Sequence, residues 1–454
     1  MLFRSLFSVI LLFFTLPLRS QNSKPNIIFI LADDLGYGDL GCYGQTFIET
    51  PNLDSLAKNG IQFSQFYAGS AVCAPSRASL LTGMHTGTSP IRGNKERFPQ
   101  GQFPLPDSTV TIATTLKDHG YNTSLIGKWG LGFTKTTGDP IYKGFESFYG
   151  YNCQRKAHRY YPRKLWDNQK VVSNKGRVYS HYIFTEKALE YVEEQKDSSF
   201  FLYLTYTIPH AKLQIPEENT LYYKGKIKND STLKKLSRKD KNKTVKYSSM
   251  VSLMDHDIGL LVAKLDSLNI LDNTIIFFAS DNGPHTESGY NPKILNSSGG
   301  FRGIKRDLYE GGIRVPLIVS WRNIINPGTI SNLACAAWDF FPTIDDILDI
   351  PNNQQINGIS ILPTKKKKKQ KAHDYLYWEF PGKGGKQAIL QNEWKLVSTK
   401  VNSSTPKYEL FNLTKDPKET NNLVNDEKDI FEKLKTLMNS AHVKNRVFKF
   451  KNEK

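Results

Sequence analysis

Five short apolar runs, the first four of which lead into polar residues, constrain the fold of this chain most strongly. They span residues 26–31, 121–126, 200–206, 274–278 and 316–319. Because the hydrophobic residues are continuous rather than alternating, these runs predict strands buried on both faces of a sheet. Helical patterns separate them at residues 50–59, 182–194 and 247–268. Strands that alternate with helices predict an α/β fold with a large, mainly parallel sheet flanked by helices.

Polar and charged residues follow the apolar runs closely. Ligands of parallel sheets bind beyond the carboxyl ends of the strands, so these residues form a candidate site. The set comprises Asp33, Asp34, Lys128, His210, Asp281 and Asn282.

The last part of the chain predicts a smaller α+β subdomain. Apolar runs at 375–378, 387–390 and 394–397 indicate strands, and residues 426–442 indicate a helix. We place the boundary within a lysine run, so that the large domain spans 21–365 and the subdomain 366–454. The lysine run itself is interpreted as a solvated loop, with a secondary polyanion contact as the alternative. Residues 225–245, rich in lysine and serine, are predicted to form a surface excursion.

Residues 1–20 have the pattern of a signal peptide. Arg4 precedes an apolar stretch at 6–16, and Ser20 offers a small residue at the cleavage point. The stretch is too short to span a membrane, and no later segment is long and apolar enough. A buried N-terminal strand is the alternative. We therefore predict an exported protein, periplasmic or secreted, without stable membrane insertion.

The charge of the chain favours a polyanionic partner. Its 61 Lys and Arg residues exceed its 43 Asp and Glu residues, which gives a formal net charge of +18. Nucleic acid, an anionic membrane and a sulfated or phosphorylated polymer all fit such a surface. Export makes an extracellular polyanion the better choice, so we predict no nucleic-acid partner. The four cysteines are too sparse for disulfides to carry the fold and show no zinc-site spacing.

Residues 71–83, with the sequence AVCAPSRASLLTG, contain the sharpest local motif. This segment resembles the signature of the formylglycine-dependent type I sulfatases, arylsulfatase-like members of the alkaline phosphatase superfamily. The resemblance implies an alkaline-phosphatase-like fold and the oxidation of Cys73 to formylglycine by a formylglycine-generating enzyme. One hydroxyl of the hydrated aldehyde would attack sulfur, and Arg77 would hold this group in place. A small buried cysteine at the start of a helix near Pro75 is the alternative interpretation.

The resemblance extends to two acidic segments, LADDLGYGDLG at 31–41 and SDNGPH at 280–285. Taken singly, such Asp and Asn pairs more often cap helices or form turns. Three carboxylates and an amide together suit a hard divalent cation, and the resemblance implies Ca²⁺. Its implied ligands are Asp33, Asp34, Asp281, Asn282 and the modified Cys73.

Three further residues match positions of this family. Lys128 lies in the segment GKW, and Lys305 precedes the segment YEGGIRVP by four residues. The resemblance implies that both lysines bind sulfate and stabilise the leaving oxygen. His210, in the segment IPHA, would contact the ester oxygen and donate a proton to the leaving alcohol. A structural histidine at a strand end is the alternative for His210.

One position departs from the family pattern. Many sulfatases have a histidine directly after Lys-Trp, whereas this chain has Gly130. The base that releases sulfate is therefore unassigned. His158 is a candidate for that role or for substrate binding, with a surface-loop histidine as the alternative. His285 is a tentative substrate contact, with ordinary loop packing as the alternative.

The resemblance covers residues 24 to about 423 and implies hydrolysis of sulfate esters on a sulfated carbohydrate or polysaccharide. One alternative is a phosphoric or phosphonate monoester hydrolase, since the superfamily overlaps chemically. A second metal site rich in His and Asp would favour that alternative, and the sequence does not show one. The other alternative is a catalytically silent protein that binds sulfated glycans through its basic surface. Substrate sugar and sulfate position stay open.

Overall fold

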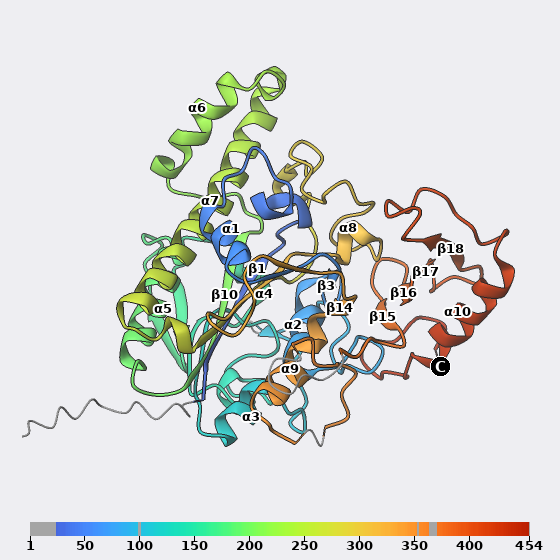
Figure 1. Ribbon diagram of the computed structural model, residues 1–454, viewed down its shortest axis with the longest axis horizontal. Helices are drawn as coiled ribbons and strands as arrows, with labels where there is room; N and C mark the ends of the chain where they lie inside the picture. The colour runs from blue at the N-terminus through green and yellow to red at the C-terminus, as the bar shows by residue number, and fades with distance from the viewer. Residues whose placement is uncertain (1–23, 99–100, 352–353, 363–369, 454) are drawn as a thin grey trace, which may run out of the picture.

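A ten-stranded mixed sheet forms the centre of the protein (Figure 1). The computed structural model describes residues 24–98, 101–351, 354–362 and 370–453. The predicted signal peptide at 1–20 and the predicted boundary between residues 365 and 366 lie outside these ranges. The strand order is β13-β2-β12-β11-β1-β10-β6-β7-β8-β9. This large sheet with helices on its faces confirms the predicted α/β fold.

The middle of the sheet is parallel, as the continuous apolar runs indicated. Strands β11, β1, β10, β6 and β7 run in the same direction. Their bounds are Thr274–Ser280, Asn26–Asp33, Phe200–Pro209, Asn122–Lys128 and Ser147–Tyr151 respectively. Antiparallel neighbours flank this block at β12 on one side and at β8 and β9 on the other. The flanking strands are β12 (Leu317–Ser320), β2 (Ile61–Phe63), β13 (Thr329–Ser331), β8 (Lys164–Asp167) and β9 (Lys170–Ser173).

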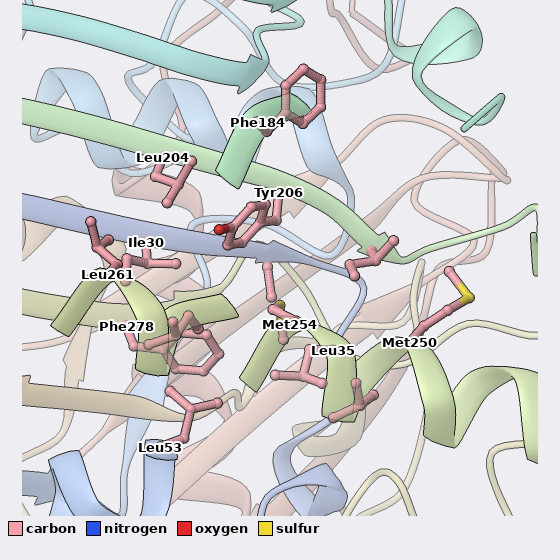
Figure 2. Packing of buried hydrophobic residues seen from close by; sticks show 14 of the residues in the cluster. Ile30, Leu35, Leu53, Phe184, Leu204, Tyr206, Met250, Met254, Leu261 and Phe278 are labelled. Atoms are coloured by element: carbon pink, nitrogen blue, oxygen red, sulfur yellow. The ribbon is translucent and has the colours of Figure 1, made fainter. Parts of the chain in front are cut away.

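Helices cover both faces, and this explains why the strands are apolar at every position. On β1, Ile28 and Ile30 face one buried cluster, whereas Ile27 and Phe29 face the other. The first cluster includes residues of α1 (Pro51–Lys58), α5 (Ser180–Glu194) and α7 (Arg238–Ser267), as Figure 2 shows. The second includes residues of α2 (Cys73–Thr82), α3 (Ile112–Asp118) and α9 (Phe340–Ile347).

The lysine-rich segment 225–245 is more regular than the sequence indicated. It contains the end of α6 (Leu221–Asn229) and the first turns of α7, which begins at Arg238 rather than at residue 247. The side chain of Ser237 caps α7 by accepting a hydrogen bond from the amide of Asp240 at 3.1 Å. Thr244 and Val245 are buried, so this part of the helix also has a packed face. The sequence did not indicate the early start of α7 or its packed face, because this segment is mostly hydrophilic.

A separate four-stranded antiparallel sheet lies near the C-terminus and confirms the predicted α+β subdomain (Figure 1). Its strands, in order, are β15 (Leu376–Phe380), β16 (Lys386–Gln391), β17 (Trp394–Thr399) and β18 (Lys407–Asn412). Helix α10 (Lys428–Ser440) packs Leu434 and Met438 against one face. The other face contributes Trp378 to a cluster that also contains Tyr67 and Ala71 of the large domain.

Short elements complete the structure. There are two further sheets of two strands each among the described residues. One pairs β3 (Phe66–Tyr67) with β14 (Cys335–Ala336), and the other pairs β4 (Glu96–Arg97) with β5 (Gly101–Gln102). The one-turn helices are α4 (Gln154–Ala157) and α8 (Glu310–Ile313).

All four cysteines are free thiols. Among the described residues, no helix combines the length and the apolar composition that crossing a membrane requires.

Candidate active site

The carboxyl ends of four parallel strands bring most of the predicted site residues together. Asp33 is the last residue of β1, and Lys128 is the last residue of β6. His210 follows β10, and Asp281 follows β11. Since these strands are mutually parallel, their carboxyl ends lie at one edge of the sheet. The structure therefore brings these residues together, as their positions at the strand ends predicted.

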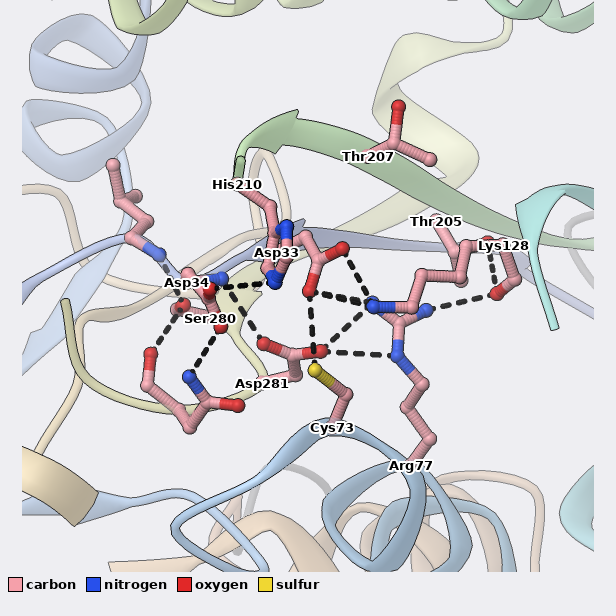
Figure 3. A network of polar contacts seen from close by, with 12 residues as sticks. Asp33, Asp34, Cys73, Arg77, Lys128, Thr205, Thr207, His210, Ser280 and Asp281 are labelled. Atoms are coloured by element: carbon pink, nitrogen blue, oxygen red, sulfur yellow. Dashed lines mark hydrogen bonds and ion pairs between the residues drawn. The ribbon is translucent and has the colours of Figure 1, made fainter. Parts of the chain in front are cut away.

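Helix α2 adds Cys73 and Arg77 to this edge. The helix begins at Cys73 itself, two residues before the predicted start, and the amide of Ala74 donates to Oδ1 of Asn94 at 3.0 Å. Cys73 and Arg77 are four residues apart and therefore share a face of the helix. The Sγ atom of Cys73 lies 3.4 Å from Oδ1 of Asp33. The guanidinium of Arg77 donates to Asp281 Oδ2 at 3.0 and 2.8 Å (Figure 3).

The site balances three buried carboxylates against three buried cations. Lys128 Nζ donates to both oxygens of Asp33, at 2.9 and 2.6 Å. Lys305 Nζ donates to Oδ2 of Asp34 at 2.8 Å. Together with the pair formed by Arg77 and Asp281, these contacts leave the cluster close to neutral. A divalent cation added to it would create a net positive charge that attracts an anionic ester.

The electrostatics of Cys73 differ from those of a reactive thiolate. Burial, and then the negative charge of Asp281, raise the pKa of the Cys73 thiol well above its usual value. Lys128 and Lys305 oppose this increase only in part. The unmodified side chain is therefore a neutral thiol, which is a weak nucleophile.

The residues present fit a calcium ion. Oδ1 of Asn282 is buried and accepts no hydrogen bond from any described residue. Leaving such a buried acceptor unsatisfied costs about 1–3 kcal/mol, so its position beside the carboxylates favours a bound cation. The carboxylate oxygens of Asp33 and Asp34 lie within 4.8 Å of each other and of the Cys73 sulfur. Oxygen ligands of this kind are those that Ca²⁺ prefers.

His210 lies inside the cluster and is neutral. Its Nδ1 lies 2.5 Å from the carbonyl oxygen of Ala211, and its Nε2 lies 2.7 Å from Nζ of Lys305. Burial, and then the positive charges of Lys305 and Lys128, lower the pKa of His210 well below its usual value. The neutral ring therefore donates from Nδ1 to Ala211 and accepts at Nε2 from Lys305.

The structure places His158 beside His210, with the two ring centroids 4.1 Å apart. This contact places His158 at the candidate site, and its role as a base or a substrate contact stays a prediction. Burial, and then Lys128 and Lys305, lower the pKa of His158 to about 3. At neutral pH its ring is uncharged, and it accepts a proton only where added negative charge, such as that of a bound ester, raises this pKa.

His285 is also brought to the site, but it is fully buried. Its ring stacks on His210 at 5.3 Å, and its Nε2 lies 3.3 Å from the carbonyl oxygen of Pro209. The rings of Tyr247 and Tyr290 lie 6.2 Å away. These neighbours favour support of His210, and the direct substrate contact stays a prediction.

Glu287 is a member of the site that sequence reasoning missed. Its carboxylate lies 3.4 Å from Nζ of Lys305, 3.4 Å from Nε2 of His210 and 2.5 Å from Nη2 of Arg306. Although burial opposes it, the charges of Lys305 and Arg306 lower the pKa of Glu287 to about 2. The one available signal was its place in the loop that begins with Asp281.

The structure gives a reason for Gly130. Its φ of 87° lies in the left-handed region, and a Cβ at this position would lie 2.6 Å from Nε2 and 2.9 Å from Cγ of Gln154. Gln154 is buried, and among the described residues its Nε2 has no hydrogen-bond partner. A histidine at position 130 would therefore require Gln154 to move.

The chain is similar to known protein families over most of its length. The sulfatase family matches residues 25–350, and a family described as "N-sulphoglucosamine sulphohydrolase, C-terminal" matches residues 301–444. An arylsulfatase from Hemicentrotus pulcherrimus is 32% identical over 371 residues, which cover 76% of this chain and 62% of that protein. The chain thus spans less than two thirds of this relative.

Two further relatives match over nearly their whole length. An N-acetylgalactosamine-6-O-sulfatase from Bacteroides thetaiotaomicron is 29% identical over 518 residues, with 93% of this chain and 94% of that protein covered. The crystal structure of Ps i-CgsB in complex with k-i-k-neocarrahexaose has a TM-score of 0.79 and 27% identity, and covers 95% of both chains. The chain therefore belongs to the sulfatase family, the sulfuric ester hydrolases of the alkaline phosphatase superfamily.

Proposed function

We propose that this protein hydrolyses sulfate esters of a sulfated carbohydrate, with formylglycine at position 73 and calcium as cofactors. The observation that carries the proposal is the buried cluster in which Cys73 meets three carboxylates and three cations at the carboxyl ends of the strands. Sulfated carbohydrate fits the relatives, since one is named an N-acetylgalactosamine-6-O-sulfatase and another was crystallised with a neocarrahexaose.

The chemistry requires the modification of Cys73. Its neutral thiol is a poor nucleophile, whereas the hydrated aldehyde of formylglycine supplies a hydroxyl that attacks sulfur. Arg77 shares the helix face with position 73, and its charge favours an ionised oxygen there. The first amide groups of α2 add a positive partial charge on the same side.

Asp33, Asp34, Asp281 and Asn282 would hold the calcium ion. The ion supplies positive charge that promotes ionisation of the nucleophile and stabilises the sulfate oxygens. Lys128 and Lys305 contribute two more cations that stabilise negative charge developing on the ester. Both ammonium groups remain charged, because Asp33 and Asp34 respectively offset the effect of burial and raise their pKa values.

Proton transfer to the leaving alcohol is assigned to Lys305 and His210 together. Their 2.7 Å hydrogen bond places a proton between Nζ and Nε2, within the same site as the nucleophile. His158, whose neutral ring lies against His210, is assigned as the base that later accepts a proton from the modified residue. Glu287 orients Lys305 through the 3.4 Å contact between its carboxylate and Nζ.

Sulfate release from a panel of sulfated saccharides tests this function. The protein is produced together with a formylglycine-generating enzyme, and mass spectrometry establishes the conversion of Cys73. Release that requires calcium and disappears in Cys73→Ala supports the proposal. Confirmed conversion without release from a broad panel contradicts it. Phosphate and phosphonate monoesters, assayed in parallel, detect the related hydrolase activity.

Export is part of the same proposal. Arg4, the apolar stretch at 6–16 and Ser20 support cleavage after residue 20, and an extracellular location suits a sulfated polysaccharide substrate. Mass spectrometry of the protein secreted by its native host measures the mature N-terminus. A mature chain that still begins at Met1 contradicts this part of the proposal.

A further inference from the structure

A strongly basic pocket opens next to the candidate active site. It has a volume of about 720 Å³ and is lined by residues between Tyr151 and Gly176. None of its described lining residues is acidic. Its cations are Arg155, Lys156, Arg159, Arg163, Lys164 and Lys175, and we refer to it as the 155–175 pocket. The volume is in the range of pockets that hold small organic ligands.

Residues adjacent to the active site in the chain and in the sheet line the 155–175 pocket. His158, whose ring stacks on His210, lies in the chain between the lining residues Lys156 and Arg159. Tyr151 pairs in register with Lys128, and its hydroxyl donates to the carbonyl oxygen of Arg159 at 2.6 Å. The pocket therefore lies on the side of the active site where His158 stands, and further sugars of a bound chain would have to extend in that direction to enter it.

The charge of this pocket is poorly neutralised by the protein. Arg155 has one acidic partner, Glu96, at 3.4 Å. In the described part of the chain, Arg159, Arg163, Lys164 and Lys175 form no ion pair with a carboxylate. Like charges gathered in one concave surface repel each other and create a local positive potential. An anionic ligand removes that repulsion, so the pocket is complementary to negative charge.

Aromatic side chains among the lining residues make the pocket suitable for a sugar. Tyr161 and Trp166 line it together with the cations. The faces of aromatic rings carry partial negative charge and attract the weakly positive C–H groups of a ring packed on them. Cations beside aromatic faces suit a ligand with both an anionic group and a ring, which describes a sulfated sugar better than a bare ion.

We propose that the 155–175 pocket binds a second, uncleaved sulfate on a neighbouring sugar of the substrate. The protein then prefers oligosaccharides with several sulfates over singly sulfated sugars. This inference deepens the proposed function and rests on it. It identifies the substrate class as multiply sulfated saccharide chains, because a neutral neighbouring sugar gains nothing from these cations.

A binding experiment isolates the pocket from catalysis. The Cys73→Ala protein is titrated calorimetrically with short dextran sulfate oligosaccharides and with uncharged dextran of equal length. The pocket variant carries Arg159→Ser, Arg163→Ser and Lys175→Ser on the same background. The control variant carries Lys228→Ser, Lys235→Ser and Lys239→Ser, which remove the same charge from exposed positions of another region. Melting temperatures establish that both variants are folded.

We expect the pocket variant to bind dextran sulfate about tenfold more weakly and the control less than about twofold more weakly. The salt dependence of binding also becomes shallower in the pocket variant. Equal losses in the two variants contradict the proposal, because they indicate a general effect of net charge. If inorganic sulfate occupies the pocket as tightly as the oligosaccharide does, the pocket is a site for single ions. That result likewise contradicts the proposal.

Kinetics separate a failure of this inference from a failure of the proposed function. On the formylglycine protein, kcat/KM is measured for 4-nitrophenyl sulfate and for a multiply sulfated oligosaccharide. The inference predicts that kcat/KM for the oligosaccharide, divided by kcat/KM for 4-nitrophenyl sulfate, falls about tenfold in the pocket variant and not in the control. Turnover with an unchanged ratio contradicts the pocket alone. Absence of all turnover after confirmed conversion contradicts the proposed function, while the titration still decides whether the pocket binds anions.

Discussion

Asn282 has a buried side-chain oxygen that accepts no hydrogen bond from any residue that the structure describes. Its amide nitrogen is occupied, because it donates to Asp34 Oδ1 at 2.6 Å and to the carbonyl oxygen of Gly283 at 3.0 Å. Asp34 itself adopts a φ of 65°, a conformation that side chains other than glycine take at a cost. A bound cation would satisfy the Asn282 oxygen, and it would also explain why Asp34 keeps this backbone conformation.

Calcium is therefore expected to stabilise the folded protein. A ligand that binds only the folded state adds about 2.7 kcal/mol at a concentration of 100 times its Kd, so chelation lowers the melting temperature. Asn282→Ala reduces the rise in melting temperature that calcium causes. Asn229→Ala, at an exposed position of α6, leaves this rise unchanged. Differential scanning calorimetry with and without chelator measures both. An identical calcium response in wild type and Asn282→Ala refutes this assignment.

His158 is expected to affect turnover but not calcium binding. Loss of a general acid or base typically slows catalysis by about 10²-fold or more, so kcat of His158→Ala falls by that order. The same variant keeps the calcium-induced rise in melting temperature, because the residue is not assigned as a ligand. His119→Ala, at an exposed helix end, is the matched control. Full turnover by His158→Ala rejects the role.

At this scale, sequence reasoning succeeded where chemistry and strand position coincide. Asp33, Lys128 and Asp281 were predictable because parallel strands bring their carboxyl ends together. Glu287 was not predictable, because one acidic residue in a loop has no pattern until the loop folds back on Lys305. The contact between His158 and His210 depends on the path of the chain after β7, which local sequence does not determine.

At the scale of elements, capping shifted the helix boundaries that periodicity predicted. Helix α2 starts at Cys73 because Asn94, distant in sequence, accepts the hydrogen bond of the Ala74 amide. Helix α7 starts at Arg238 because Ser237 caps it. Strand β18 was not predicted, and it pairs with β17 over residues Lys407–Asn412. Each difference depends on a polar partner or a neighbouring strand rather than on hydrophobic pattern.

The turn after β6 yields a prediction about Gly130. We expect Gly130→Ala to destabilise the protein by about 2 kcal/mol more than Gly120→Ala, because overpacking adds to the backbone strain. Both glycines have positive φ, of 87° and 78°, but a Cβ at position 120 meets nothing within 4 Å. Urea unfolding measures the difference.

A second substitution tests the cause. Gln154→Ala removes the atoms that a Cβ at position 130 would contact. It should therefore be less harmful in the Gly130→Ala background than in the wild type. Additive effects of the two substitutions would rule out direct steric overlap.

At the scale of the whole molecule, buried ion pairs connect the C-terminal sheet to the site. Lys395 on β17 bonds Glu310 at 2.8 Å and Glu419 at 2.9 Å, and all three side chains are fully buried. Glu310 begins α8, which follows the loop that carries Lys305. Trp378 on β15 also donates to the carbonyl oxygen of Ala68 at 2.9 Å, shortly before α2. The smaller sheet therefore supports two segments that carry candidate site residues.

A second link between the two parts is sensitive to pH. The buried carboxylate of Glu379 accepts hydrogen bonds from Arg92 at 2.7 Å and from His442 at 2.6 Å. This bond to Glu379 raises the pKa of His442 above its usual value, although burial opposes the change. Glu453 also favours, and Arg92 disfavours, the protonated ring.

Because protonation of His442 is favoured in the folded protein, its stabilisation is complete below the unfolded-state pKa of about 6.5. It is lost as the pH rises through the higher pKa of the folded state. We therefore expect the free energy of unfolding of the wild type to exceed that of His442→Gln most at about pH 6, with the difference shrinking by about pH 9. Denaturant titrations at both pH values, with His119→Gln as control, measure it. A constant difference contradicts the ion pair.

The overall architecture was predictable only in part. Alternating strands and helices determined the fold class, because each β-rich run is buried on both faces. The order of the ten strands was not available from the sequence, since it depends on pairings such as that between β2 and β13, whose residues are far apart in the chain. Antiparallel pairing of β11 with β12 likewise has no local signature.

Cys73 exposes 1% of its surface, and every residue of α2 is buried. An enzyme that oxidises Cys73 has to bind the chain segment around it, and in the folded protein this segment is a buried helix. The proposed conversion must therefore come before folding, while the segment is still extended. Under the proposed mechanism, a chain that folds with its Cys73 thiol intact would be well folded but inactive. A cell that synthesises this protein faster than it oxidises Cys73 would accumulate inactive protein. Oxidising enzyme supplied after folding would not convert that protein.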